Sequence, residues 1–270
     1  MIDFHVLGAG GAVPTPTHNP AAYWVVVDGT GILMDPGPGA LVRLAQPGLI
    51  PQGIDDLGLV ILTHLHPDHC ADLVPLLFAA HSPVPVATAD LRLFGPPGLA
   101  TYLDRLKEIY GSWLEPRRRK LVVTEIGPGV TIGLDGGGSV RPFAVDHPQD
   151  RLASLALGYR FSDAGGRTAI FSGDTGPCAA LNKAARGADL LVVECSTPDH
   201  LATPGHMTVT QVAELCADAR PGRVVLTHQY PDAAALDLPA LIRPYFAGPV
   251  IQAVDGTVVH LNAPPGDPAP

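Results

Sequence analysis

The chain has few charged residues and few cysteines for its length. Only 16% of its 270 residues are charged and 46% are hydrophobic, a composition that argues against disorder. The four cysteines form no Cys-x-x-Cys pair, so the sequence suggests neither a zinc knuckle nor a disulfide scaffold. Free thiols in a reducing compartment are the simpler interpretation.

Long apolar runs and a secretory leader are also missing. No run reaches the roughly 18 apolar residues of a membrane span, so no membrane association is expected. Residues 1–11 lack the basic start, apolar stretch and cleavage site of a signal peptide, which favours a cytoplasmic location. The formal net charge of −9 argues against a general affinity for nucleic acid, because such affinity usually comes from a basic surface. The sequence does not exclude a homodimer.

Short β-rich runs alternate with helical patterns along the chain. Residues 57–63, LGLVILT, form an apolar run typical of a strand buried on both faces. Helical patterns follow Gly98 and occupy residues 177–188 and 208–220, the last opened by Thr208 as an N-cap. This alternation favours a layered α/β architecture. We expect one domain over residues 1–262 and a disordered tail at 263–270.

The strongest chemical signal is the segment THLHPDHCADL, which directly follows the apolar run 57–63. Within six residues it contains four potential metal ligands, His64, His66, Asp68 and His69. Imidazoles and carboxylates suit Zn²⁺. Residues two apart in an extended stretch point the same way, so His64 and His66 can share one metal. Asp68 and His69, where the chain turns, can face a second metal.

Three more potential ligands recur downstream in matching contexts. His147 in VDHP, Asp174 in FSGDT and His228 in VLTHQ each follow an apolar, strand-like run. The pattern HxHxDH with a later His, Asp and His resembles the dinuclear signature of the metallo-β-lactamase superfamily. Residues 7–23 and 33–39 resemble its N-terminal strands, and the resemblance extends from about residue 4 to 230. It implies a four-layer αββα sandwich with the metal site at one edge of the two sheets.

The same resemblance implies how the ligands divide. It puts His64, His66 and His147 on one zinc ion and Asp68, His69 and His228 on the other, with Asp174 bridging them. The implied cofactors are therefore two Zn²⁺, for which Mn²⁺ or Fe could substitute. A water held between two such metals becomes a hydroxide near neutral pH.

The segment PGHMT at 204–208 resembles the His-x-Ser/Thr element of the ribonuclease Z-like branch. The resemblance implies that His206 serves the leaving group and that Glu194, at the end of the preceding strand-like run, orients His206. Asp68, His206 and Glu194 are thus the catalytic candidates. The plain alternatives are that His206 only caps the helix beginning at Thr208 and that Glu194 is structural.

One departure from that branch concerns the substrate. Ribonuclease Z enzymes typically carry a tRNA-gripping arm between the third histidine ligand and the bridging aspartate, whereas here only residues 148–173 lie between His147 and Asp174. Residues 117–120 form the only basic run, which could contact a phosphate-bearing substrate but is better explained as a solvated loop. We therefore expect a small or modest phosphate ester as substrate, and we do not expect tRNA.

The sequence thus predicts a zinc-dependent phosphodiesterase that uses a zinc-bridging hydroxide. The nearest alternative is a dizinc hydrolase of a carboxylic ester, thioester, lactone or sulfate ester. A diiron redox enzyme on this fold usually has Glu at the position of His66, and a non-catalytic scaffold normally loses ligands, whereas all seven are present here.

Overall fold

The computed structural model describes residues 1–46, 53–83, 89–148 and 155–261, and these residues form two seven-stranded sheets. The first sheet has the order β14-β1-β2-β3-β4-β5-β6 and consists of β1 (Ile2–Gly8), β2 (Ala22–Val27), β3 (Thr30–Met34), β4 (Leu59–Ile61), β5 (Leu91–Gly95), β6 (Leu121–Glu125) and β14 (Val258–His260). The second has the order β13-β12-β11-β10-β9-β8-β7 and consists of β7 (Ile132–Gly133), β8 (Ser139–Val145), β9 (Ala156–Ser162), β10 (Thr168–Phe171), β11 (Leu190–Glu194), β12 (Val224–Thr227) and β13 (Val250–Gln252).

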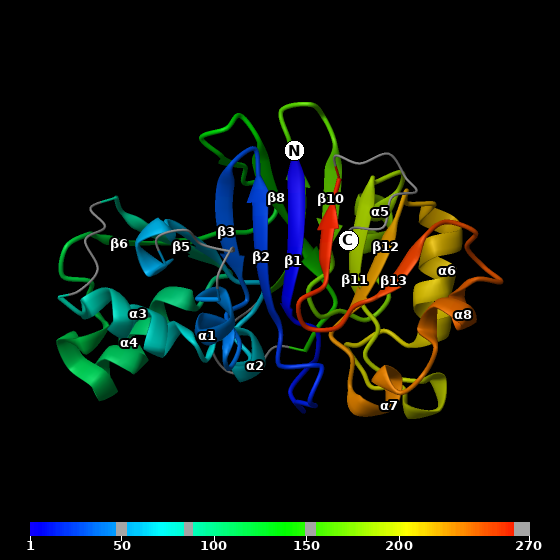
Figure 1. The fold of residues 1–270 in the computed structure, drawn as a ribbon, viewed down its shortest axis with the longest axis horizontal. Coiled ribbons are helices and arrows are strands. Elements are labelled where there is room, and N and C mark those ends of the chain that lie inside the picture. The colour runs from blue at the N-terminus through cyan, green and yellow to red at the C-terminus, as the bar shows by residue number, and fades with distance from the viewer. Residues whose placement is uncertain (47–52, 84–88, 149–154, 262–270) are drawn as a thin grey trace.

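Helices cover the outer face of each sheet (Figure 1). The first sheet is covered by α1 (Ala40–Leu44), α2 (Pro67–Cys70), α3 (Leu73–His81) and α4 (Leu99–Tyr110). The second is covered by α5 (Ala179–Ala185), α6 (Val209–Ala219) and α8 (Leu238–Ile242). The remaining short helices are α7 (Pro231–Ala234), η1 (Gly53–Asp56), η2 (Gly111–Leu114) and η3 (Asp199–Leu201). The expected four-layer αββα sandwich is therefore confirmed.

Three buried clusters hold the layers together. The largest lies between the two sheets and includes the aromatic side chains of Phe4, Tyr23, Tyr159, Phe161 and Phe171. The other two lie between each sheet and its helices. Burial of apolar surface of this extent is the main stabilising contribution in a domain of this size.

Strand β4 explains why the apolar run at 57–63 is continuous. Leu59 and Ile61 face the cluster between the sheets, whereas Val60 and Leu62 face the helices. The strand is thus buried on both faces, as the sequence predicts, although its ladder is limited to Leu59–Ile61.

The strand directions place many chain ends at one edge of the sandwich. Strands β8 and β10 are both antiparallel to β9, and β10, β11 and β12 are mutually parallel, so β8, β10, β11 and β12 end at the same edge. The carboxyl end of β4 lies there too, because the Leu157 amide donates to the Thr63 carbonyl across the sheets at 3.0 Å. Ligand sites in open α/β sheets form at such carboxyl ends.

Two findings bear on the expectations for membrane and tail. Among the described residues, no helix combines the length and apolar character needed to cross a lipid bilayer. The tail expected at 263–270 lies outside the described residues.

Candidate metal centre

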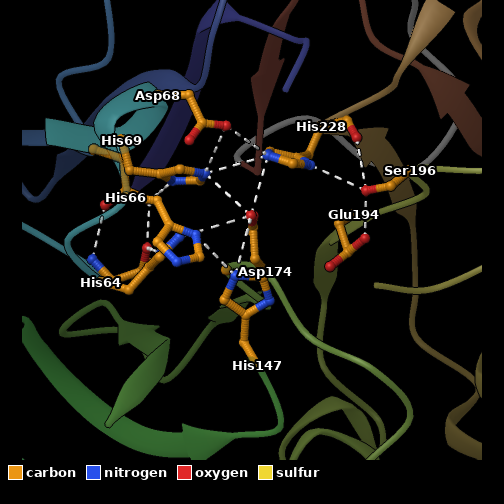
Figure 2. Close-up of polar contacts among 12 residues, drawn as sticks. His64, His66, Asp68, His69, His147, Asp174, Glu194, Ser196 and His228 are labelled. Carbon is orange, nitrogen blue, oxygen red and sulfur yellow. Dashed lines mark hydrogen bonds and ion pairs between the residues drawn. The ribbon is translucent and has the colours of Figure 1, made fainter. Parts of the chain in front are cut away.

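The seven predicted ligands come together at the sheet edge defined above, from loops that follow four different strands (Figure 2). His64, His66, Asp68 and His69 lie between β4 and the end of α2. His147 follows β8, Asp174 follows β10 and His228 follows β12. Five of the seven ligands therefore lie in loops that follow strands, whereas Asp68 and His69 lie in α2, and both sheets contribute.

Asp174 occupies the middle of the group. Its Oδ2 lies 3.1 Å from His228 Nε2 and 3.2 Å from His69 Nε2. The same oxygen is 3.8 Å from His64 Nε2 and 4.0 Å from His147 Nε2. One carboxylate oxygen thus faces nitrogens from both ligand sets, which is the placement that a bridging ligand needs.

Two of the close groups of ligand atoms match the two expected sets, and a third group joins His64 and His69, from different sets, with Asp174. The ligand atoms of His64, His66 and His147 lie within 4.8 Å of one another, and so do those of Asp68, His69 and His228. His147 Nε2 is 3.1 Å from His66 Nδ1, and His69 Nε2 is 3.2 Å from His228 Nε2. Ring nitrogens that face each other so closely cannot both carry hydrogens.

The donor set therefore fits metal cations. His64 Nε2 is fully buried and has no hydrogen-bond partner among the described residues, an arrangement that is costly unless the nitrogen has a ligand to bind. Borderline-soft Zn²⁺ prefers imidazole nitrogens and carboxylate oxygens, the groups that converge here.

A buried carboxylate behind the ligands orients two of them. Asp35 accepts hydrogen bonds from the Thr63 amide and hydroxyl, both at 2.7 Å, and lies 3.0 Å from His69 Nδ1. The Thr63 hydroxyl also lies 2.9 Å from His64 Nδ1. Such partners fix the ring orientation and tautomer of a metal-binding histidine. Asp35 thus has a structural role beneath the ligands.

Two residues of the site have left-handed backbone conformations, which non-glycine residues rarely adopt. Asp35 has φ 45° and His228 has φ 52°. The His228 ring also packs so closely against Gly11 that a Cβ at that position would lie 2.9 Å from the ring. This backbone strain, of order 1–3 kcal/mol per residue, is typical of functional sites.

Glu194 and His206 form a second group beside the seven ligands. His206 Nδ1 lies 3.2 Å from both carboxylate oxygens of Glu194. The His206 ring centre is 4.9 Å from that of His147 and 5.4 Å from that of His228. His66, Asp68 and His206 are partly exposed, whereas the other five ligand residues are buried, so the group is open to solvent on the side of these three residues.

The charges in the group compensate one another. Burial lowers the pKa of His206, but the hydrogen bond and charge of Glu194 outweigh burial and raise it to about 9. Burial would raise the pKa of Asp174, yet the charges of His228 and His69 hold it well below its usual range. Burial likewise opposes ionisation of Asp68, while the hydrogen bond to His228 and the charge of His69 bring its pKa to about 2. In the absence of metal, protonated imidazoles therefore balance the carboxylates.

A family model for the Beta-lactamase superfamily domain matches residues 30–229. The chain belongs to the metallo-β-lactamase superfamily. It is 32% identical to Ribonuclease Z of Mycobacterium avium, over 98% of this chain and 100% of that protein. The resemblance to the ribonuclease Z-like branch of this hydrolase family is thereby confirmed.

Solved structures show the same fold. The metallo-β-lactamase fold protein YhfI from Bacillus subtilis aligns over 96% of this chain and 100% of its own, with a TM-score of 0.79 and 21% identity. The short form of human tRNase Z aligns over 97% of this chain and 100% of its own, with a TM-score of 0.76 and 24% identity.

The expectation that excludes tRNA is wrong, because relatives of this chain are named Ribonuclease Z and a solved structure with the same fold is named tRNase Z. Proteins named Ribonuclease Z match this chain over 87% and 100% of their own length. The net charge of the chain was a poor guide to its substrate class, and the reason is physical. It averages over the whole surface, whereas substrate binding depends on local charge, and Arg117, Arg118 and Lys120 are exposed in an otherwise acidic chain.

The basic run and the cysteine next to His69 lie outside the ligand group. Arg119, within the basic run, is buried and donates to the Leu57 carbonyl. Cys70 directly follows His69, but its thiol points to the Leu65 carbonyl and the Tyr102 hydroxyl, each at 3.4 Å. Burial raises the pKa of the Cys70 thiol to about 11, in keeping with a protonated side chain packed against its neighbours.

Sequence reasoning missed Ser196. Its hydroxyl lies between Glu194 and His228, at 2.5 Å from the first and 3.0 Å from the second. The only signal in the sequence is its position two residues after Glu194, and serine is too common for that spacing to be informative.

Proposed function

We propose that the chain is a dinuclear zinc phosphodiesterase. His64, His66 and His147 would hold one ion, Asp68, His69 and His228 the other, and Asp174 would bridge them. Two such ions supply Lewis acidity for the phosphate oxygens and lower the pKa of a bound water. The proposed substrate class is phosphodiesters, including those of RNA, because the relatives named Ribonuclease Z match over nearly the full chain.

The observation that carries the proposal is the Glu194–His206 pair. An alkoxide leaving a phosphodiester needs a proton, and His206 is held with Nδ1 toward Glu194, which leaves Nε2 for the substrate side. With a pKa of about 9, the imidazole is protonated at neutral pH. His206 thus donates the proton from Nε2 to the leaving oxygen, and Glu194 stabilises the charged ring before the transfer.

Asp68 has a further role at the exposed side of the site. Its Oδ2 faces His69 and His228, at 3.7 and 3.5 Å. With a pKa of about 2 the carboxylate is ionised, and its other oxygen, Oδ1, can accept a proton from the attacking water. Asp68 and His206 would then serve the entering and leaving groups respectively.

A substrate panel tests the proposal. Zinc-loaded protein should hydrolyse bis(p-nitrophenyl) phosphate and cleave RNA diesters, with precursor tRNA as one substrate. It should have far lower turnover of p-nitrophenyl acetate and of a thioester. Preference for the carboxylic ester or thioester would reject the phosphodiesterase and support the alternative hydrolase.

A further inference from the structure

Ser196 joins the two loops that carry His206 and His228. It follows β11 and is fully buried. Its amide donates to the Met207 carbonyl at 3.1 Å, and its carbonyl accepts from the Tyr230 amide at 3.1 Å. The backbone of Ser196 is therefore bonded to residues adjacent to both histidine-bearing turns.

The hydroxyl of Ser196 has more neighbours than it has hydrogens. Its Oγ lies 2.5 Å from Glu194 Oε2, 2.9 Å from the His228 carbonyl and 3.0 Å from His228 Nδ1. Two of these neighbours can only accept, and one hydroxyl has one hydrogen to donate. An ionised carboxylate at 2.5 Å is the stronger acceptor, and without a hydrogen between them the two oxygens would repel each other.

This assignment determines which ring nitrogen of His228 carries the hydrogen. With its own hydrogen given to Glu194, Ser196 Oγ accepts from His228 Nδ1–H. With its hydrogen on Nδ1, His228 would bind a metal through the lone pair of Nε2, the atom that lies 3.1 Å from Asp174 Oδ2 and 3.2 Å from His69 Nε2. Figure 2 shows Ser196 between His228 and Glu194, connected to each by a polar contact.

The same hydroxyl also completes the environment of Glu194. This buried carboxylate accepts from the Thr175 amide at 2.5 Å, from the Met207 amide at 3.1 Å, from Ser196 and from His206. Two of the four donors are backbone amides, which hold the carboxylate beside His206.

We propose that Ser196 is a positioning residue whose hydroxyl links His228 Nδ1–H to Glu194 and so couples the orientation of the metal-site histidine to that of the proton donor His206. The kinetic part of this inference rests on the proposed phosphodiesterase function, whereas the structural part does not. Loss of such a supporting hydrogen bond typically costs about 10- to 100-fold in activity.

The structural part is tested by proton NMR of the imidazole N–H groups. The protein should show hydrogen-bonded, slowly exchanging N–H resonances from His206 and His228, assigned by their loss in His206→Gln and His228→Gln. Ser196→Ala should remove or broaden the His228 resonance and shift that of His206. Unchanged resonances for both histidines in Ser196→Ala would overturn the proposal, whether or not the enzyme hydrolyses diesters.

The kinetic part uses two substrates and a matched control. Ser196→Ala should lower turnover of uridylyl-uridine, which has a poor leaving group, about 10- to 100-fold. It should lower turnover of bis(p-nitrophenyl) phosphate much less, because p-nitrophenolate needs little protonation. Thr197→Val removes the neighbouring buried hydroxyl, which has no hydrogen-bond partner among the described residues, and should leave both rates unchanged.

Two outcomes separate failure of the inference from failure of the proposed function. Equal losses on both substrates, or a loss matched by Thr197→Val, would contradict the positioning role. If wild-type protein hydrolyses neither diester, the proposed function fails and the NMR result alone decides the inference. If Ser196→Ala does not fold, Ser196→Cys replaces it, because a thiol is nearly isosteric but a weak hydrogen-bond donor and should give the same pattern.

Discussion

At the scale of single residues, Asp174 makes the contacts on which the proposed centre most depends. Its Oδ2 is within 4.0 Å of four histidine nitrogens drawn from both ligand sets. Asp174→Ala would remove a ligand from both ions and leave their mutual repulsion uncompensated. Zinc content should therefore fall from about two per chain to well below one.

The comparison variant for this prediction is His228→Ala, which removes a ligand from one ion only. It should retain more zinc than Asp174→Ala in the same elemental analysis. Equal zinc loss in the two variants would show that Asp174 does not bridge.

His206 makes a different prediction because it is not among the seven proposed ligands. His206→Ala should retain both zinc ions and lose ~10²–10⁴ in turnover, the range typical of general acid catalysis. The loss should be larger for a ribosyl leaving group than for p-nitrophenolate. Lower zinc content, or equal losses on both substrates, would reject the proton-donor role.

The pKa of His69 links metal binding to pH. Burial would lower this pKa, but Asp174 and Asp35 on either side of the ring raise it well above 6.5. His69 is thus protonated in the metal-free protein at neutral pH and must lose that proton to bind zinc through Nε2. Zinc affinity should weaken as pH falls, by about tenfold per pH unit for each proton released.

Isothermal titration of metal-free protein in two buffers of different ionisation heat checks this proton release. The observed enthalpy should differ between the buffers in proportion to the protons released. The same enthalpy in both buffers would mean that His69 is neutral before zinc binds.

At the scale of elements, helix α6 begins directly after the loop that carries His206. Thr208 caps it, with a reciprocal bond in which the Thr208 amide donates to Gln211 Oε1 at 2.9 Å. Thr208→Ala should destabilise the protein by about 0.5–2 kcal/mol. In a domain of this size, that corresponds to a melting temperature lower by a few degrees.

Thermal unfolding of zinc-loaded protein measures the effect, with Thr208→Ser as the control because it keeps the capping oxygen. An equal decrease in both variants would show that the methyl group of Thr208, and not its hydroxyl, stabilises the helix.

Elements with a strong periodic pattern could be predicted from the sequence. Strand β1 matches the run IDFHVLG, α4 begins after Gly98, and α6 begins after its predicted cap at Thr208. The short strands β13 and β14 were missed. Each has three residues and forms only by pairing with a strand far away in sequence, as Val259 does with Phe4. A three-residue run carries too little pattern to predict such a partner.

That the seven proposed ligands gather at one edge was predictable for a similar reason, since the segments that carry them follow apolar runs that the sequence shows. The hydrogen-bond network behind the ligands could not be predicted from the sequence. Asp35, Thr63 and Ser196 bond to ligand histidines only because loops distant in sequence meet at the sheet edge. No local spacing records these contacts.

At the scale of the whole molecule, the centre lies where the two sheets meet. His64, His66, Asp68 and His69 come from the first sheet, and His147, Asp174 and His228 come from the second. Both proposed metal sets therefore draw ligands from both sheets. The core between the sheets holds the two halves of the centre in register, and bound metal should in turn stabilise the sandwich.

The most direct test of a dinuclear zinc phosphodiesterase is a zinc titration of the metal-free protein with activity as the readout. Turnover of bis(p-nitrophenyl) phosphate should rise with added zinc and reach its plateau at about two zinc ions per chain, as expected of a two-metal site. The bound zinc, measured by elemental analysis at the plateau, should equal the number added. A plateau at one zinc per chain, or turnover that does not depend on zinc, would contradict the account.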